Sequence, residues 1–135
     1  MKVNPYLLFN GNCREAFQAY EKVLGGKIQQ ISTFGEAPPG MSQPGWSDKV
    51  MHAFMTFGDN VLMASDAPPQ HYEPMTGMSV SLNVDTPQEA ERIWKGFAEG
   101  AQIKMELQAT FWAERFGMLV DRFGTPWMVN CQKKQ

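Results

Sequence analysis

The side chains best suited to acid or base chemistry are one histidine and two carboxylates that lie far apart in the sequence. His52 lies at the start of a predicted hairpin, while Glu106 and Asp121 lie toward the C-terminus. Imidazole and carboxylate groups act as general acids or bases when a substrate comes within hydrogen-bonding reach. None of the three stands at the spacing of a Ser–His–Asp or Cys–His system. A lyase or isomerase that uses one of them is therefore an alternative, and the catalytic residues remain unassigned.

The stretch ATFWAERFG, residues 109–117, is a candidate for binding rather than for catalysis. It places two large aromatic side chains, Phe111 and Trp112, beside the charged residues Glu114 and Arg115. Aromatic rings stack on flat organic molecules, and they also fill protein interfaces. We predict that the two rings form a lid over a binding site or a plug in an interface. Glu114 and Arg115 are expected to form a solvated pair at its rim, which contributes little.

Two amphipathic helices are predicted, at residues 12–24 and 86–99. In both, apolar residues recur at i, i+3, i+4 and i+7, which gives one buried stripe on a helix. Each begins with a capping-box pattern, centred on Asn12 in the first helix and on Thr86 in the second. Each is followed by glycine, a residue that commonly ends helices.

Four further segments have the pattern of β-structure. Single strands are predicted before the helices, at residues 5–9 and 79–84. Hairpins are predicted after them, at residues 51–65 and 117–130. The sequences FGDNVLM and FGTPWMV in the two hairpins align without a gap, so we expect the hairpins to correspond.

The order strand, helix, strand and hairpin therefore occurs twice. The two modules span about residues 1–66 and 77–131, and the Pro-rich segment 67–76 connects them. A loop rich in Pro and Gly, residues 35–46, interrupts the first module. This organisation predicts a single α+β domain, residues 1–135, built from a pseudo-symmetric pair of βαβββ modules.

Composition excludes several functional classes. The chain has 135 residues, 12 basic and 14 acidic, without a basic stripe, so nucleic-acid binding is not expected. No apolar run is long enough to span a bilayer, and no signal peptide is evident, so we expect a cytoplasmic protein without membrane partners. Cys13 and Cys131 share no motif and are expected to be free, buried thiols.

Four stretches carry a resemblance to a known group of proteins: PYLLFNGNCREAFQAYEKVLGG, STFGEAPPG, MHAFMTFGDNVLMASDAPP and ATFWAERFGMLVDRFGTPWMVN. In these the chain resembles the vicinal oxygen chelate superfamily of glyoxalase I, extradiol dioxygenases and the bleomycin and fosfomycin resistance proteins, and more narrowly its PhnB-like branch. The resemblance implies two βαβββ modules whose curved sheets enclose a cup, in a homodimer. The branch has also been labelled a demethylubiquinone methyltransferase. We see no glycine-rich strand-to-helix loop that would hold a methyl-donor nucleotide.

The resemblance also indicates where a metal would bind. Members that use a metal place ligands on the first and last strands of each module. By spacing, the equivalent positions are Pro5, Leu62, Ser79 and Met128. If the register is shifted by one residue, they are Tyr6, Met63, Val80 and Val129. Neither set offers the His, Glu or Gln donors that a divalent ion needs. We therefore expect neither a metal nor another cofactor.

Strand alternation predicts which side chains line the cup. From the second module these are Ser79, Ser81, Asn83, Leu119, Asp121, Phe123, Met128 and Asn130. From the first module they are Leu7, Phe9, Met51, Ala53, Met55, Phe57, Leu62 and Ala64. Alternatively, Ser79 and Ser81 face solvent on an open sheet. The same alternation places His52 on the helix-packed face, yet it belongs to the family pattern and stays a candidate.

Together these features predict a protein that binds a small, partly apolar organic molecule without a metal. The residues expected to bind it are Met55, Ser79, Ser81, Asn83, Glu106, Phe111, Trp112, Asp121, Asn130 and His52. Besides the lyase or isomerase, the alternatives are a resistance protein that sequesters an antibiotic, and a dimeric scaffold whose cup is filled by its own side chains.

Overall fold

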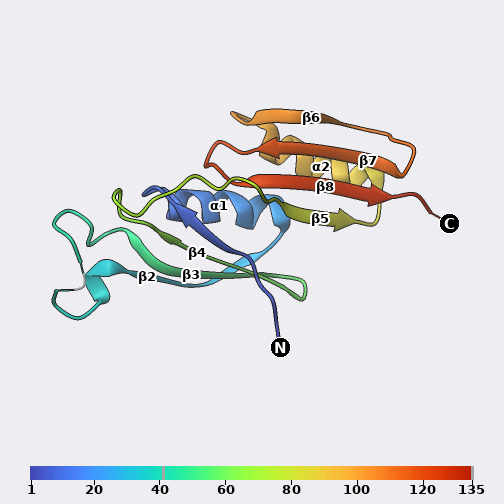
Figure 1. Ribbon diagram of the computed structural model, residues 1–135. Helices are drawn as coiled ribbons and strands as arrows, with labels where there is room; N and C mark the ends of the chain where they lie inside the picture. The colour runs from blue at the N-terminus through green and yellow to red at the C-terminus, as the bar shows by residue number, and fades with distance from the viewer. Residues whose placement is uncertain (41, 135) are drawn as a thin grey trace. The chain divides into compact units, whose positions relative to one another are not determined.

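A computed structural model describes residues 1–40 and 42–134 of the chain (Figure 1). The chain divides into two compact units, residues 1–74 and 75–135. No helix in the described part of the chain is long and apolar enough to cross a membrane.

The first unit is one mixed sheet with a helix across one face. Its elements are β1 (Tyr6–Phe9), α1 (Cys13–Leu24), β2 (Lys27–Thr33), the short 3₁₀ helix η1 (Phe34–Glu36), β3 (Val50–Phe57) and β4 (Asn60–Asp66). The strand order is β1-β4-β3-β2, in which β1 and β4 are parallel and the other pairs are antiparallel.

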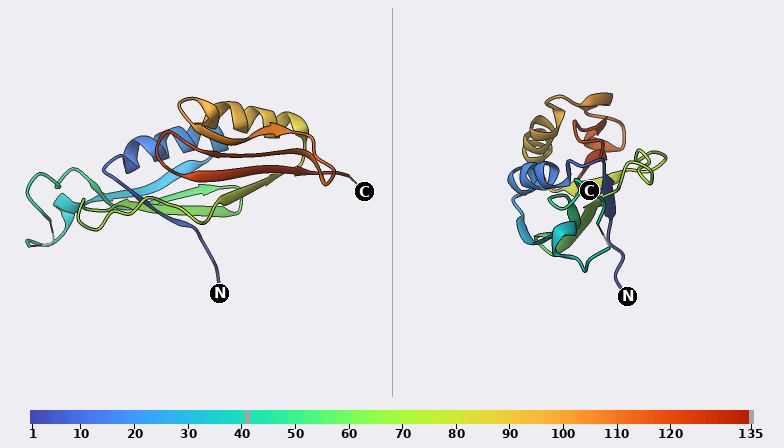
Figure 2. Two further views of the ribbon diagram at one scale, coloured as in Figure 1. Left: turned by 45° about the horizontal axis from the view of Figure 1, so that its top comes forward. Right: turned by 90° about the vertical axis from the view of Figure 1, so that its left-hand side faces the viewer.

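The second unit repeats this arrangement. Its elements are β5 (Val80–Val84), α2 (Pro87–Ala98), β6 (Gln102–Gln108), β7 (Ala113–Val120) and β8 (Pro126–Gln132). The strand order β5-β8-β7-β6 is the same as in the first unit, again with one parallel pair. Each helix packs on the strands of its own sheet (Figure 2). The predicted pair of βαβββ modules is therefore confirmed.

The two helices begin in different ways. The predicted cap of α2 is confirmed, because the Thr86 side chain accepts a hydrogen bond of 3.1 Å from the Glu89 N–H. The predicted cap of α1 is wrong, because the Asn12 side chain makes no capping hydrogen bond. A carboxylate from the end of β4 replaces it: Asp66 accepts from the Cys13 N–H and from the Val50 N–H, both at 2.9 Å. This buried side chain ties the start of α1 to β3.

Both cysteines are free and fully buried, as predicted. Burial raises the pKa of the Cys13 thiol, and the nearby Asp66 carboxylate raises it further. Burial also raises the pKa of the Cys131 thiol, with a further contribution from Glu114. The folded protein therefore holds both thiols in the neutral form at a pH where unfolded cysteines, with pKa values of about 8.5, begin to ionise.

This difference predicts a loss of stability at alkaline pH. Above about pH 8.5 the unfolded chain releases thiol protons that the folded chain retains, so the free energy of unfolding falls as pH rises. Urea unfolding at pH 7.5 and 9.5 measures this. The Cys13→Ala/Cys131→Ala double variant should lose less stability between the two pH values than the parent protein. An equal loss in both proteins would show that the thiols do not contribute.

The two faces of the first sheet are the reverse of the prediction. Leu7, Phe9 and Met55 are at most 1% exposed. The Phe9 ring lies 6.4 Å from the Tyr20 ring of α1, so this face is the helix-packed one. The same holds for the buried residues Ala53, Leu62 and Ala64. These side chains therefore do not line an open surface. Sequence alternation separates the two faces of a strand, but with apolar residues on both it does not show which one the helix covers.

The second sheet follows the prediction on β5 and β8 but not on β7. Asn130 of β8 pairs with Asn83 of β5 and with Phe116 of β7, so these three side chains share one face. Leu119 pairs with Trp127 and is buried on the α2 side. The turn of this hairpin, residues 121–125, is longer than the turn of the first by an odd number of residues. The ungapped alignment of the hairpins therefore shifted every side chain of β7 to the wrong face.

Candidate functional site

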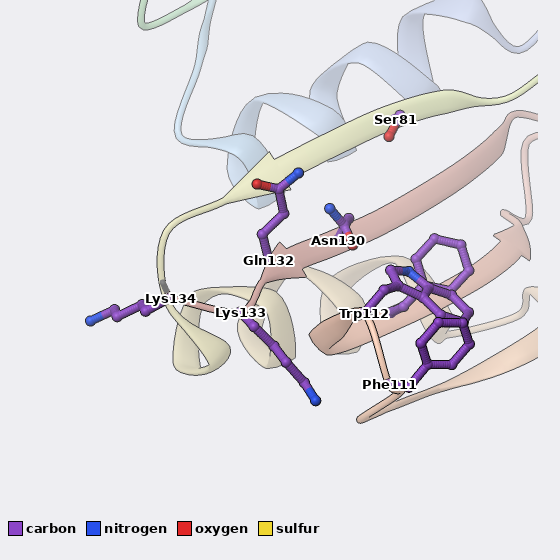
Figure 3. A pocket seen from close by; sticks show the side chains of 8 residues that line it. Ser81, Phe111, Trp112, Asn130, Gln132, Lys133 and Lys134 are labelled. Atoms are coloured by element: carbon purple, nitrogen blue, oxygen red, sulfur yellow. The ribbon is translucent and has the colours of Figure 1, made fainter.

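A pocket of about 580 Å³ opens on the second sheet, on the face away from α2 (Figure 3). All of its lining residues belong to the second unit. They are Ser81, Phe111, Trp112, Phe116, Asn130, Gln132, Lys133 and Lys134. The volume is within the range of pockets that hold small organic molecules.

The polar wall of the pocket comes from the parallel strands β5 and β8. Asn83 and Asn130 lie opposite each other, and the Asn130 amide Nδ2 donates a hydrogen bond of 3.1 Å to the Asn83 Oδ1. The Asn130 Oδ1 is buried and has no partner among the described residues. An acceptor left unpaired in this way carries a desolvation cost, which a donor on a ligand would remove. Ser81, two residues before Asn83, adds a hydroxyl on the same face.

The opposite wall is aromatic. Phe111 and Trp112 end the short loop between β6 and β7, where the Thr110 hydroxyl accepts from the Ala113 N–H at 3.0 Å. The Phe111 and Trp112 rings meet edge to face with centroids 4.8 Å apart, and the Trp112 and Phe116 rings lie 5.6 Å apart. We call Phe111, Trp112 and Phe116 the aromatic shelf.

The shelf is exposed to an unusual degree for rings of this size. Phe111 is 88% exposed and Trp112 is 47% exposed. Because burial of each ring would stabilise the protein, large exposed apolar side chains mark surfaces that bind a ligand or a partner. The role of Phe111 and Trp112 as a lid or plug stays a prediction.

The charged residues of ATFWAERFG do not form the predicted rim pair. Glu114 and Arg115 are consecutive residues of β7, at a shift in its register with β8, and each has a separate side-chain partner. The Arg115 Nε donates to the Glu91 carboxylate of α2 at 3.1 Å, and Glu114 accepts from the Cys131 thiol at 3.7 Å. Both charges therefore serve the packing of β7.

The structure brings together five of the ten predicted binding residues. Ser81, Phe111, Trp112 and Asn130 line the pocket, and Asn83 bonds to Asn130. Two others from the second unit lie outside the lining: Ser79 precedes β5, and Glu106 is exposed on β6.

Asp121 is also outside the pocket lining, and its carboxylate is engaged in a turn. It is buried and accepts hydrogen bonds from the Phe123 N–H at 2.9 Å and the Thr125 N–H at 3.0 Å. Its second oxygen accepts from the Trp127 Nε1 at 2.8 Å. A carboxylate held by this many donors stabilises the turn between β7 and β8.

The last two predicted residues belong to the first unit. Met55 is fully buried on the α1 side of β3. His52 is partly exposed and lies on the other face, so its expected place among the helix-packed side chains is corrected. Its Nδ1 shares a hydrogen bond of 3.2 Å with the Tyr6 hydroxyl, and the two rings are stacked.

Sequence reasoning missed four residues of the lining: Phe116, Gln132, Lys133 and Lys134. Phe116 and Gln132 follow from strand register, because both share a face with Asn130 once the turn at 121–125 is counted correctly. The lysines come after the end of β8, where no strand pattern extends. No signal in the sequence places them at the site.

The side chains at the positions expected for a metal do not suit a divalent ion. Of the expected positions, Tyr6 pairs with Met63, whereas Met128 pairs with Ser81 and not with the expected Ser79. The open-face positions therefore offer phenol, hydroxyl and thioether groups. Divalent ions of such sites prefer imidazole and carboxylate donors. Across residues 1–40 and 42–134, no three His, Cys, Asp or Glu side chains gather where they could hold a metal.

A sequence profile of the family described as 3-demethylubiquinone-9 3-methyltransferase matches residues 1–130. The chain belongs to this family. The Escherichia coli K12 protein YjdN, a relative, is 34% identical, and the match covers all of this chain and 98% of YjdN. Protein PA1353 from Pseudomonas aeruginosa is 49% identical, with a TM-score of 0.91 over 99% of both chains. The PhnB protein from Bacillus cereus is 25% identical, with a TM-score of 0.83 over 97% of this chain and 99% of its own.

More distant structures place this PhnB-like family within the expected superfamily fold. A glyoxylase/bleomycin resistance protein/dioxygenase domain from Frankia has a TM-score of 0.69 at 11% identity, over 98% of both chains. The fosfomycin resistance protein FosX from Listeria monocytogenes has a TM-score of 0.64 at 9% identity, over 98% of this chain and 93% of its own. The predicted resemblance is confirmed at the level of fold.

Proposed function

We propose that the protein binds a small organic molecule with a flat apolar part in the pocket of the second sheet, and that it does so as a homodimer without a metal ion. The observation that carries the proposal is the aromatic shelf standing across the pocket from a hydroxyl and an unpaired amide oxygen. Apolar walls with a few polar groups suit a small ligand, which stacks on the rings and is oriented by hydrogen bonds.

The homodimer has support of its own in the first unit. Tyr6 is 45% exposed and Leu8 is 41% exposed. Both lie on the face of β1 opposite its buried side chains. Association of such surfaces removes apolar area from water.

Removing the two exposed rings tests the binding site directly. Phe111→Ala/Trp112→Ala should weaken binding of a neutral flat probe, 2-naphthamide, about 10- to 100-fold, because each ring contributes about 1 kcal/mol by stacking. Isothermal titration calorimetry measures the affinity. The control is Met78→Ala, which removes another exposed apolar side chain of the same unit outside the pocket lining and should leave the affinity unchanged. Failure of 2-naphthamide to bind the parent protein, or unchanged binding by the folded double variant, would contradict the proposal.

The absence of a metal requirement is tested separately. We expect the purified protein to contain no stoichiometric metal by elemental analysis, because the open-face strand positions offer only weak or soft donors. Dialysis against EDTA should leave the affinity for 2-naphthamide unchanged. One tightly bound ion per subunit, or loss of binding after dialysis, would refute this part.

A further inference from the structure

The charged side chains that line the pocket are both cationic. Lys133 and Lys134 follow β8, and among the described residues the lining includes no acidic side chain, although Asp85 and Glu114 lie near Cys131 at the end of β8. The whole chain has a formal net charge of −2, so this balance is local and opposite to that of the protein. Neither lysine takes part in an ion pair within the described part of the chain. Two unpaired ammonium groups beside a cavity make its potential positive, which favours an anion.

The lysines stand at one end of the pocket and the aromatic shelf at its side. In the close view, Lys133 extends on the side of Phe111, whereas Lys134 points away from the rings (Figure 3). Both ammonium groups are on flexible, exposed side chains, which can reach a charged group near the mouth. A ligand whose ring stacks on Phe111 and Trp112 would then present a substituent toward Lys133.

We infer that the pocket selects flat organic anions, molecules in which an aromatic ring carries a carboxylate. This inference rests on the proposed binding function and adds the chemical class of the ligand. The ring lies against the aromatic shelf, the carboxylate faces Lys133 and Lys134, and a hydroxyl or N–H donor on the ring would satisfy the unpaired Asn130 Oδ1. Charge-assisted hydrogen bonds from lysine to carboxylate are stronger than neutral ones, so the charge decides between ligands of equal shape.

Two probes of nearly the same shape separate the ring from the charge: 2-naphthoate and 2-naphthamide. By calorimetry at low ionic strength, 2-naphthoate should bind about tenfold more tightly. Raising the salt should reduce this preference, because exposed charges are screened. Lys133→Gln should lower the affinity for 2-naphthoate about fivefold, and Lys133→Gln/Lys134→Gln should remove the preference while the affinity for 2-naphthamide is retained.

The control is Lys95→Gln, which makes the same charge change on an exposed residue of α2, outside the pocket lining. It should leave both affinities unchanged. Equal affinities of the parent protein for the two probes would overturn the anion preference and leave the proposed function standing. A preference that survives in the double lysine variant would equally overturn it. Binding of neither probe would overturn both the preference and the proposed site.

Discussion

Replacing Asp121 by asparagine is expected to lower the free energy of unfolding by about 2–4 kcal/mol, although the change removes a single charge. The carboxylate is buried and accepts from two backbone N–H groups and from the Trp127 indole. An amide keeps one acceptor oxygen, so its NH₂ group must face at least one of these donors. A buried donor left unpaired costs about 1–3 kcal/mol, and the lost hydrogen bonds were charge-assisted. Urea unfolding followed by tryptophan fluorescence measures the loss.

The matched control is Glu106→Gln, which makes the same change at an exposed carboxylate on β6. It should alter the unfolding free energy by about 0.5 kcal/mol or less. The pair also distinguishes two roles for Asp121. If the role of Asp121 is structural, the Asp121→Asn variant should be less stable. It should still bind 2-naphthamide at urea concentrations below its unfolding transition. If Asp121→Asn unfolds like the parent protein, the turn does not depend on this carboxylate. That result would favour the alternative in which Asp121 acts as a general acid or base.

The features that the sequence predicted correctly are local ones. Helix periodicity, the Thr86 cap, Gly25 and the two hairpins are local patterns, and the structure reproduces them because each depends on residues within a few positions. The duplication followed from comparing these local patterns. The cap of α1 could not be predicted from local patterns, because its acceptor is Asp66, which lies 53 residues from Cys13 along the chain.

The site was less predictable than the fold because it depends on strand register. Ser81, Asn83 and Asn130 could be placed on one face from β5 and β8 alone. Phe116 could not, since its face depends on the length of the turn at 121–125, and a miscount of one reverses β7. Lys133 and Lys134 reach the pocket only through the path of the chain after β8, which periodicity does not describe.

The second large effect is expected at Gly117, in the middle of β7. The buried face of this strand meets the Trp94 ring of α2 so closely that a β-carbon on Gly117 would lie 2.6 Å from Cζ3 and 2.8 Å from Cη2 of that ring. It would also lie 3.0 Å from the Leu107 Cα. Real β-carbons essentially never come so near a ring. Gly117→Ala should therefore push α2 away from the sheet and lower the free energy of unfolding by about 2–3 kcal/mol.

A double-mutant cycle identifies the clash as the cause. Trp94→Phe removes the part of the indole that contains Cζ3 and Cη2, so Gly117→Ala should cost less in that background than in the parent protein, with a coupling of about 1 kcal/mol or more. Additive losses would mean that the Leu107 backbone, not the indole, limits the space. Gly117 lies between Phe116 and Met118, whose side chains point to the open face. Close packing of α2 behind Gly117 therefore fixes the strand that carries Phe116, and a shift of α2 should weaken 2-naphthamide binding as well as stability.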